Sequence, residues 1–131
     1  MRGYLLDTHT FLWWTGEPAR LPTAVLGILR SPDSSLLLST ASAWELQIKV
    51  GLGKLQLDVA LEEIIDREIA ENGLALLPIE LAHIIALGAL PPLHRDPFDR
   101  MLIAQARAED LVLVSGDGLV RAYPDVAVLW A

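Results

Sequence analysis

Short runs of apolar residues recur along the chain and are separated by longer segments. The runs lie at residues 4–6, 36–38, 75–77, 111–114 and 126–129, and each is continuous rather than alternating. A continuous apolar run is typical of a strand that is buried on both faces of a parallel sheet. The pattern therefore predicts a sheet of about five buried strands.

Helical spacing of apolar residues predicts the elements between these runs. The predicted helices cover residues 42–50, 58–71, 81–87 and 98–108. Gly51 follows the first, and Asp96 with Pro97 precedes the last, which are typical stop and start signals. Strands that alternate with helices indicate an α/β fold, with three layers (α/β/α) around a central, mainly parallel sheet. The 131 residues contain no repeat or long linker, so we expect a single domain over residues 1–131.

Composition narrows the class of protein. Hydrophobic residues make up 53% of the chain, but no apolar run reaches the roughly 18 to 20 residues of a membrane span. Asp7 interrupts the short apolar N-terminal stretch, which therefore differs from a secretory signal. The absence of cysteine excludes disulfides and thiolate metal sites. We expect a soluble, cytoplasmic protein with no membrane partner.

The charge of the chain is strongly negative. The net charge is −7, which argues against a protein that coats nucleic acid but not against an enzyme that cuts it. Residues 58–71 contain six acids, with Arg67 as the single base. This segment is predicted to be a solvated helix face, and a docking surface for a basic partner protein is the alternative.

Four acids fall at positions where a parallel sheet forms its ligand sites. Such sites lie at the carboxyl ends of the strands. Asp7 follows the first apolar run, Asp117 follows the fourth, and Glu45 comes a turn and a half of helix after the second. Asp99 is in the first turn of the helix predicted at 98–108. We therefore expect these carboxylates to converge at one edge.

Converging carboxylates repel one another unless a cation neutralises them. Mg²⁺ and Mn²⁺ prefer oxygen ligands, and such ions promote the attack of water on a phosphodiester. Each acid alone has another interpretation: Asp117 lies between two glycines in a plausible turn, and Asp96 before Pro97 suits a helix cap. The prediction of a metal site depends on the convergence.

Four segments together resemble a known family. They are LLDT at 5–8, STASAWE at 39–45, DPFDRMLIAQA at 96–106 and SGD at 115–117. These segments resemble the four acidic motifs of PIN-domain proteins, and within that family they are most similar to the VapC-type toxins of toxin–antitoxin pairs. The resemblance spans nearly the whole chain. It implies a PIN fold, an endoribonuclease that depends on Mg²⁺ or Mn²⁺, a homodimer, and inhibition by a cognate antitoxin.

Carried over to this sequence, the resemblance implies four catalytic, metal-binding acids. They are Asp7, Glu45, Asp99 and Asp117. Asp96 is an additional acid, either a fifth metal ligand or a helix cap.

Polar and basic neighbours extend the predicted site. Thr8 and Ser115 occupy places where the family often has a hydroxyl, which would position water or phosphate. Hydrogen bonding at the strand ends is the alternative. Lys49, Arg95 and Arg100 flank the motifs and are candidates for RNA contact, with salt bridges to nearby acids as the more common role.

The aromatic residues near the motifs have open roles. Trp13 and Trp14 are adjacent, so one of them is expected to reach a protein interface or an RNA base. Trp44 is expected in the core. His94 is expected to be exposed to solvent, and His9 lies close to Asp7 without an assigned role.

Two other functions remain as alternatives. A phosphotransferase of the haloacid-dehalogenase kind would need a second Asp two residues after Asp7, and His9 stands there instead. A PIN-like module that binds nucleic acid or protein without catalysis is the main alternative. Loss of one of the four acids would mark such a module, and all four are present.

Overall fold

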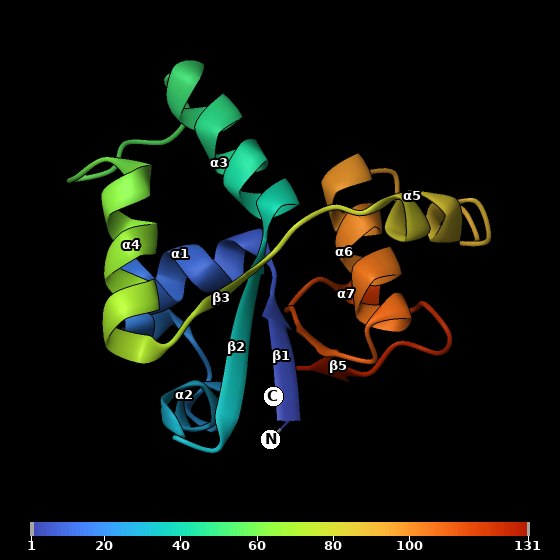
Figure 1. The fold of residues 1–131 in the computed structure, drawn as a ribbon, viewed down its shortest axis with the longest axis horizontal. Helices are drawn as coiled ribbons and strands as arrows, with labels where there is room; N and C mark the ends of the chain where they lie inside the picture. Colours follow the sequence, from blue (N-terminus) through green and yellow to red (C-terminus); the bar gives the residue numbers. More distant parts are fainter. Residues whose placement is uncertain (1, 131) are drawn as a thin grey trace.

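A parallel sheet of five strands forms the centre of the molecule (Figure 1). The computed structural model describes residues 2–130. The strands are β1 (Arg2–Leu6), β2 (Ser34–Ser39), β3 (Ala75–Leu77), β4 (Val112–Val114) and β5 (Val128–Leu129). Their order is β3-β2-β1-β4-β5, and each neighbouring pair is parallel. Each of the five apolar runs in the sequence therefore overlaps one strand, and the predicted sheet is confirmed.

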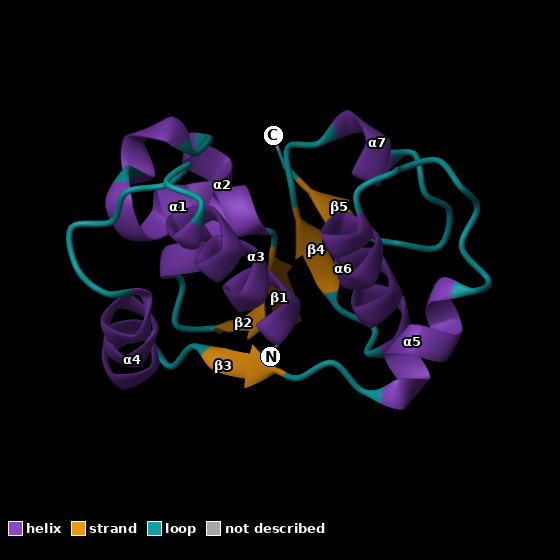
Figure 2. Ribbon diagram, turned by 90° about the horizontal axis from the view of Figure 1, so that it is seen from above, coloured by secondary structure: helices purple, strands orange, loops and turns teal. Residues whose placement is uncertain are grey.

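Helices cover both faces of this sheet (Figure 2). They are α1 (Thr8–Gly16), α2 (Thr23–Arg30), α3 (Thr40–Gly51), α4 (Leu61–Asn72), α5 (Leu81–Leu87), α6 (Pro97–Ala108) and α7 (Gly118–Arg121), with a 3₁₀ turn at Pro18–Arg20. Helices α1 to α4 contribute to one buried cluster, and α5 to α7 pack into or against another on the opposite face. The three-layer α/β/α architecture is thus confirmed.

Alternate residues of the central strands belong to different layers of the core. Leu5 and Leu113 pack on the α6 side, whereas Leu6 and Val114 pack on the α1 side. All four side chains are fully buried, and burial of each stabilises the fold by about 1.5 to 3 kcal/mol. Burial on both faces is the physical reason that these strands are continuous apolar runs.

Three helices were not predicted from the periodicity. The apolar residues of α1 are bunched at 11–14, so they do not form the usual helical stripe. What starts this helix is Asp7, whose Oδ1 accepts a hydrogen bond of 2.8 Å from the Thr10 N–H. Helix α7 has only four residues, and α2 begins at Thr23 after Pro22 without a side-chain cap.

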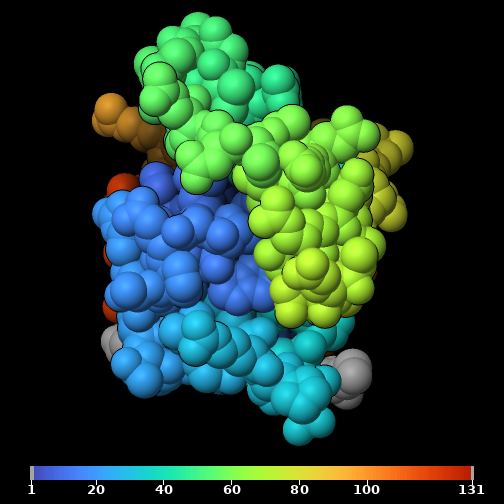
Figure 3. Space-filling model, turned by 90° about the vertical axis from the view of Figure 1, so that its left-hand side faces the viewer, coloured from blue at the N-terminus to red at the C-terminus, as the bar shows by residue number. Residues whose placement is uncertain are grey.

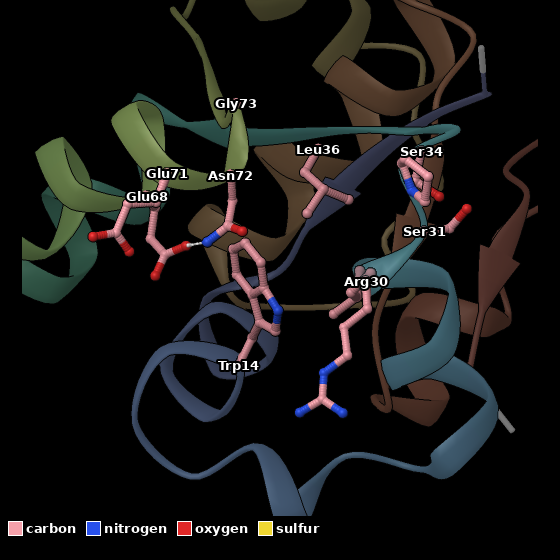
Figure 4. A pocket seen from close by; sticks show the side chains of 11 residues that line it. Trp14, Arg30, Ser31, Ser34, Leu36, Glu68, Glu71, Asn72 and Gly73 are labelled. Atoms are coloured by element: carbon pink, nitrogen blue, oxygen red, sulfur yellow. Dashed lines mark hydrogen bonds between the residues drawn. The ribbon is translucent and has the colours of Figure 1, made fainter.

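A hollow of about 480 Å³ opens at the amino end of β2 (Figure 4). Trp14 and Arg30 line it from one side, and the last turn of α4 lines it from the other. On that turn the Asn72 amide donates a hydrogen bond of 2.6 Å to Glu68 Oε2. Because the predicted acids follow the carboxyl ends of the strands, this hollow is not part of their site. Among the described residues, no helix is long and apolar enough to cross a membrane.

Candidate active site

Three of the predicted acids line one cleft at the carboxyl edge of the sheet. Asp7 ends β1, Asp99 lies in the first turn of α6, and Asp117 follows β4. The cleft has a volume of about 430 Å³, and Trp13 and Trp130 form part of its wall. The fold therefore brings together acids that are 92 and 110 residues away from Asp7 in the sequence.

Glu45 joins this group from α3. Its side chain is buried, with Oε1 accepting a hydrogen bond of 2.6 Å from the Thr8 hydroxyl. Its other oxygen, Oε2, lies 3.1 Å from Lys49 Nζ. Glu45 and Asp7 are both close enough to Asp99 for their charges to raise the pKa of that residue. Asp7, Glu45 and Asp99 thus share one electrostatic environment, and Asp117 lines the same cleft as Asp7 and Asp99.

Asp99 carries the clearest sign of crowded negative charge. Burial raises its pKa, the charges of Asp96, Asp7 and Glu45 raise it further, and His94 partly opposes them. The result is a pKa of about 7 instead of 3.8. Among the described Lys and Arg side chains, only Lys49 forms an ion pair with one of the four acids. A set of carboxylate oxygens with so little compensating charge fits a hard divalent cation such as Mg²⁺ or Mn²⁺.

His94 bridges two of the acids. Its Nε2 atom lies 2.9 Å from Asp117 Oδ2 and 3.2 Å from Asp99 Oδ2, and its side chain is only 10% exposed. The expectation that this histidine is exposed to solvent was therefore wrong. Burial acts to raise the pKa of Asp117, but hydrogen bonds from His94 and from the Leu119 N–H hold it below the usual value.

Asp96 is the N-cap of α6. Its Oδ1 accepts hydrogen bonds from the Phe98 N–H at 2.8 Å and the Asp99 N–H at 3.3 Å. The helix-cap alternative is thus what the structure shows for this oxygen. Its role as a metal ligand stays a prediction, although its charge contributes to the raised pKa of Asp99.

The two hydroxyls next to the acids are buried and already bonded. Thr8 donates to Glu45, as described above, and its Oγ1 lies 3.2 Å from Ser42 Oγ. Ser115 Oγ accepts a hydrogen bond of 3.1 Å from the Asp117 N–H. In this geometry both hydroxyls orient the acids. That they also position water or phosphate stays a prediction.

The three basic candidates are placed very differently. Lys49 is paired with Glu45, which was the alternative to an RNA contact. Arg100 Nη1 donates to the Pro91 carbonyl and to Tyr123 Oη, each at 3.1 Å, so it fastens the loop that precedes α6. This geometry favours a structural role for Arg100. Arg95 is exposed.

The tryptophans also have distinct positions. Trp44 was expected in the core, which was wrong: its side chain is 60% exposed on α3 and meets Phe98 edge to face at 5.2 Å. This contact between α3 and α6 leaves most of the indole in solvent. Trp13 lies beside Trp130 at 6.2 Å, and the Arg20 guanidinium lies 4.6 Å from its ring centroid.

A larger groove of about 710 Å³ adjoins the acidic cleft. It is lined by α1, by the segment 54–59 and by α4. In Figure 3 the blue residues of α1 form the floor of this hollow, with yellow-green α4 on one side and the green segment above. His9 and Trp13 line both the groove and the cleft, so the two are neighbours. The groove has a modest excess of basic side chains that the cleft lacks: Arg20, Lys49, Lys54 and Arg67 line it, against the acids Glu17 and Asp58.

Comparison with known proteins assigns the family. The family model described as PIN domain matches residues 4–125. The chain belongs to the PIN-domain family. Ribonuclease VapC22 of Mycobacterium tuberculosis is 28% identical to this PIN domain over 134 residues, covering 99% of this chain and 100% of that protein.

Solved structures share the fold of this PIN domain. VapBC2 from Rickettsia felis, bound to a DNA fragment from its promoter, has a TM-score of 0.75 at 18% identity, over 98% of this chain and 99% of that one. DNA-bound VapBC from Salmonella typhimurium has a TM-score of 0.65 at 19% identity, over 98% of both chains. At these identities the likeness concerns the fold alone.

Two features of this PIN domain's site were missed in the sequence. The bridging role of His94 had one local signal, since the residue stands two positions before a helix cap. Trp130 gave no signal, because nothing in the sequence shows that the end of the chain returns to the cleft. A Cβ on Gly116 would lie 2.8 Å from the Trp130 ring, so this glycine allows the indole to close the cleft wall.

Proposed function

We propose that this PIN domain is an endoribonuclease that hydrolyses RNA phosphodiester bonds with Mg²⁺ or Mn²⁺. The observation that carries the proposal is the convergence of four acids, Asp7, Glu45, Asp99 and Asp117. Their crowding is clearest at Asp99, whose pKa is raised to about 7. The name of the relative VapC22 supports ribonuclease chemistry.

The four acids would hold the cation through their oxygens. A divalent cation bound there would act as a Lewis acid toward the phosphate and lower the pKa of a bound water. The protein's own contribution is orientation: Thr8 fixes Glu45, and Ser115 fixes the backbone at Asp117. The indoles of Trp13 and Trp130 limit the access of bulk water from one side of the cleft.

The groove beside the cleft supports a polyanionic substrate. Four of the ten Lys and Arg residues of this acidic chain line it. Such side chains position nucleic acid through its phosphates. We propose that single-stranded RNA lies along this groove and reaches the acids past Trp13, where a base would stack on the ring in place of the Arg20 guanidinium.

We further propose that the protein acts in the cytoplasm as the toxin of a type II toxin–antitoxin pair. The structural neighbours from Rickettsia felis and Salmonella typhimurium are named as VapBC assemblies, and this supports a cognate antitoxin as the protein partner. An antitoxin that covers the acidic cleft would need to offset its negative charge, so we expect it to present a basic side chain there.

A homodimer remains part of the proposal, and α5 offers a surface for it. Leu81, Ile84 and Ile85 share one face of this short helix and are 69%, 50% and 68% exposed, while His83 packs inward against α6. We expect the double variant Leu81→Lys, Ile85→Lys to halve the molar mass measured by light scattering. An unchanged mass for the variant, or a monomeric wild type, would contradict this interface.

The function is tested by cleavage of single-stranded RNA with purified protein. We expect cleavage with Mn²⁺ and none after EDTA, and we expect Glu45→Gln to lower the rate by roughly a hundredfold. Glu62→Gln, on the exposed face of α4, is the matched control and should cleave like the wild type. RNA binding without cleavage by the wild type would instead support the binding-module alternative. Equal cleavage by Glu45→Gln would show that the activity comes from elsewhere.

A further inference from the structure

His94 stands where a metal ligand would be expected. Its Nε2 atom and one carboxyl oxygen each from Asp99 and Asp117 all lie within 4.8 Å of one another. If Nε2 were a ligand, the site would combine nitrogen with oxygen donors, a set that favours transition metals over Mg²⁺. Whether Nε2 can be a ligand depends on which ring nitrogen of His94 carries the proton.

The backbone at the start of α6 selects the tautomer of this ring. The Asp96 N–H donates a hydrogen bond of 3.0 Å to His94 Nδ1. A nitrogen that accepts a hydrogen bond carries no proton, so the single proton of the neutral ring is on Nε2. A metal ligand needs a free lone pair at that atom, whereas Nε2–H has none. The donor Asp96 N–H belongs to the N-cap residue of α6, so it is held in place by the helix itself.

The rest of the loop keeps the ring in this position. The His94 N–H donates to Tyr123 Oη at 2.9 Å, and the same phenol oxygen accepts from Arg100 Nη1. Arg100 also holds the Pro91 carbonyl. The loop before α6 is thus fastened to the helix and to Tyr123, which leaves the imidazole little freedom to turn its other nitrogen toward the acids.

We propose that His94 is a positioning residue that donates its Nε2–H to Asp117 Oδ2, with Asp99 Oδ2 beside it at 3.2 Å, and that it is not a metal ligand. One imidazole placed between two carboxylates fixes the position of acids from different elements, α6 and the segment after β4. It contacts Oδ2 of each, and a cation would then be held by Asp99 Oδ1, by Asp7 Oδ2, and by oxygens of Asp117 and Glu45 that each already accept one hydrogen bond. The binding of a cation by these oxygens rests on the proposed function, whereas the tautomer of His94 does not.

The tautomer is measured directly by long-range ¹H–¹⁵N correlation NMR on labelled protein, without metal and after addition of Mg²⁺. We expect the Nε2–H tautomer of His94 in both states. A proton on Nδ1 in the metal-free protein would overturn the hydrogen-bond assignment. Loss of the Nε2 proton when Mg²⁺ is added would show that Nε2 is a ligand, and would overturn the proposal.

Two substitutions separate the nitrogens of the ring. In His94→Gln the amide N–H replaces Nε2–H, whereas the amide of His94→Asn reaches only as far as Nδ1. We expect Mn²⁺ affinity, measured by electron paramagnetic resonance, to stay within about threefold for Gln and to fall on the order of tenfold for Asn. Leu93→Ala, an exposed neighbour in the same loop, is the control.

The outcomes of this series are distinct. Equal losses of Mn²⁺ affinity for Gln and Asn would contradict a donor role at Nε2. An Nε2–H tautomer in a protein that binds no Mn²⁺ and cleaves no RNA would remove the proposed function and leave the bridging role of His94 intact. Circular dichroism and a urea titration of each variant exclude unfolding as the cause of a loss.

Discussion

Asp99→Asn should abolish RNA cleavage and, at the same time, stabilise the metal-free protein. The carboxylate of Asp99 lies among three other acids, with a pKa raised to about 7 by burial and by the charges of Asp96, Asp7 and Glu45. An uncharged amide removes this repulsion and also removes a ligand oxygen with full negative charge. We expect a loss of cleavage of roughly a hundredfold or more, since even the outer partners of metal ligands contribute 10- to 100-fold.

The pH dependence of the stability follows from the same shift. A carboxyl group whose pKa is higher in the folded state than in the unfolded chain makes folding less favourable as it ionises. For Asp99 this cost is absent below pH 4, grows as the pH rises from about 4 to about 7, and is complete above that range. The difference from 3.8 to about 7 corresponds to an upper bound of about 4 kcal/mol, which solvent screening of this partly exposed carboxylate reduces.

The measurement is the free energy of unfolding in urea, with EDTA, at several pH values. We expect Asp99→Asn to match the wild type near pH 4 and to exceed it by up to about 4 kcal/mol at pH 8. Asp33→Asn, exposed in the turn before β2, is the control and should change neither stability nor cleavage. Mn²⁺ should stabilise the wild type much more than Asp99→Asn. A variant that is less stable than the wild type at pH 8 would refute the account of crowded charge.

The central architecture was predictable because its physical cause is local in the sequence. A strand that is buried on both faces must be apolar at every position, and the runs at 4–6 and 36–38 are. The common location of the acids then follows from the rule that ligand sites form at the carboxyl edge of a parallel sheet. For this reason the sequence alone predicts Asp7 and Asp117 at the same edge.

What the sequence did not reveal depends on contacts between distant segments. Trp44 has the hydrophobicity of a core residue, but it lies on the face of α3 opposite to the buried residues, so its indole is largely exposed beside Phe98. His94 looked like a loop residue because its two carboxylate partners come from α6 and from the end of β4. Trp130 reaches the cleft only because β5 pairs with β4 and returns the chain to that edge.

Three of the acids at this edge are helix caps, and this role does not prevent them from binding a metal ion as well. Asp7, Asp96 and Asp117 are the N-caps of α1, α6 and α7, and each uses Oδ1 for its cap. In Asp117 the other oxygen meets His94, so a cap does not exclude a second interaction. Helix N-termini carry partial positive charge. Three of them at one edge lower the cost of gathering carboxylates there and favour the approach of a phosphate.

Substitutions of Asp7 can separate its role as a helix cap from its role as a metal ligand. Asparagine is as good an N-cap as aspartate, whereas alanine is not. Asp7→Asn should keep the hydrogen bond from the Thr10 N–H and the stability of α1, while Asp7→Ala should lose about 1 kcal/mol of unfolding free energy. Because both variants lack the carboxylate, both should lose cleavage by roughly a hundredfold or more.

The decisive measurement on Asp7→Asn is the pKa of the neighbouring Asp99. The charge of Asp7 contributes to the raised pKa of Asp99, so removal of that charge should lower the Asp99 pKa, as followed by NMR of the side-chain carboxyl carbon in metal-free protein. Asp58→Asn, in the exposed segment before α4, provides the control for a general change in net charge. If the Asp99 pKa moved equally in both variants, Asp7 and Asp99 would not share a site. If Asp7→Asn kept full cleavage, the oxygen of Asp7 would serve only as a cap, and the cation would depend on the other three acids.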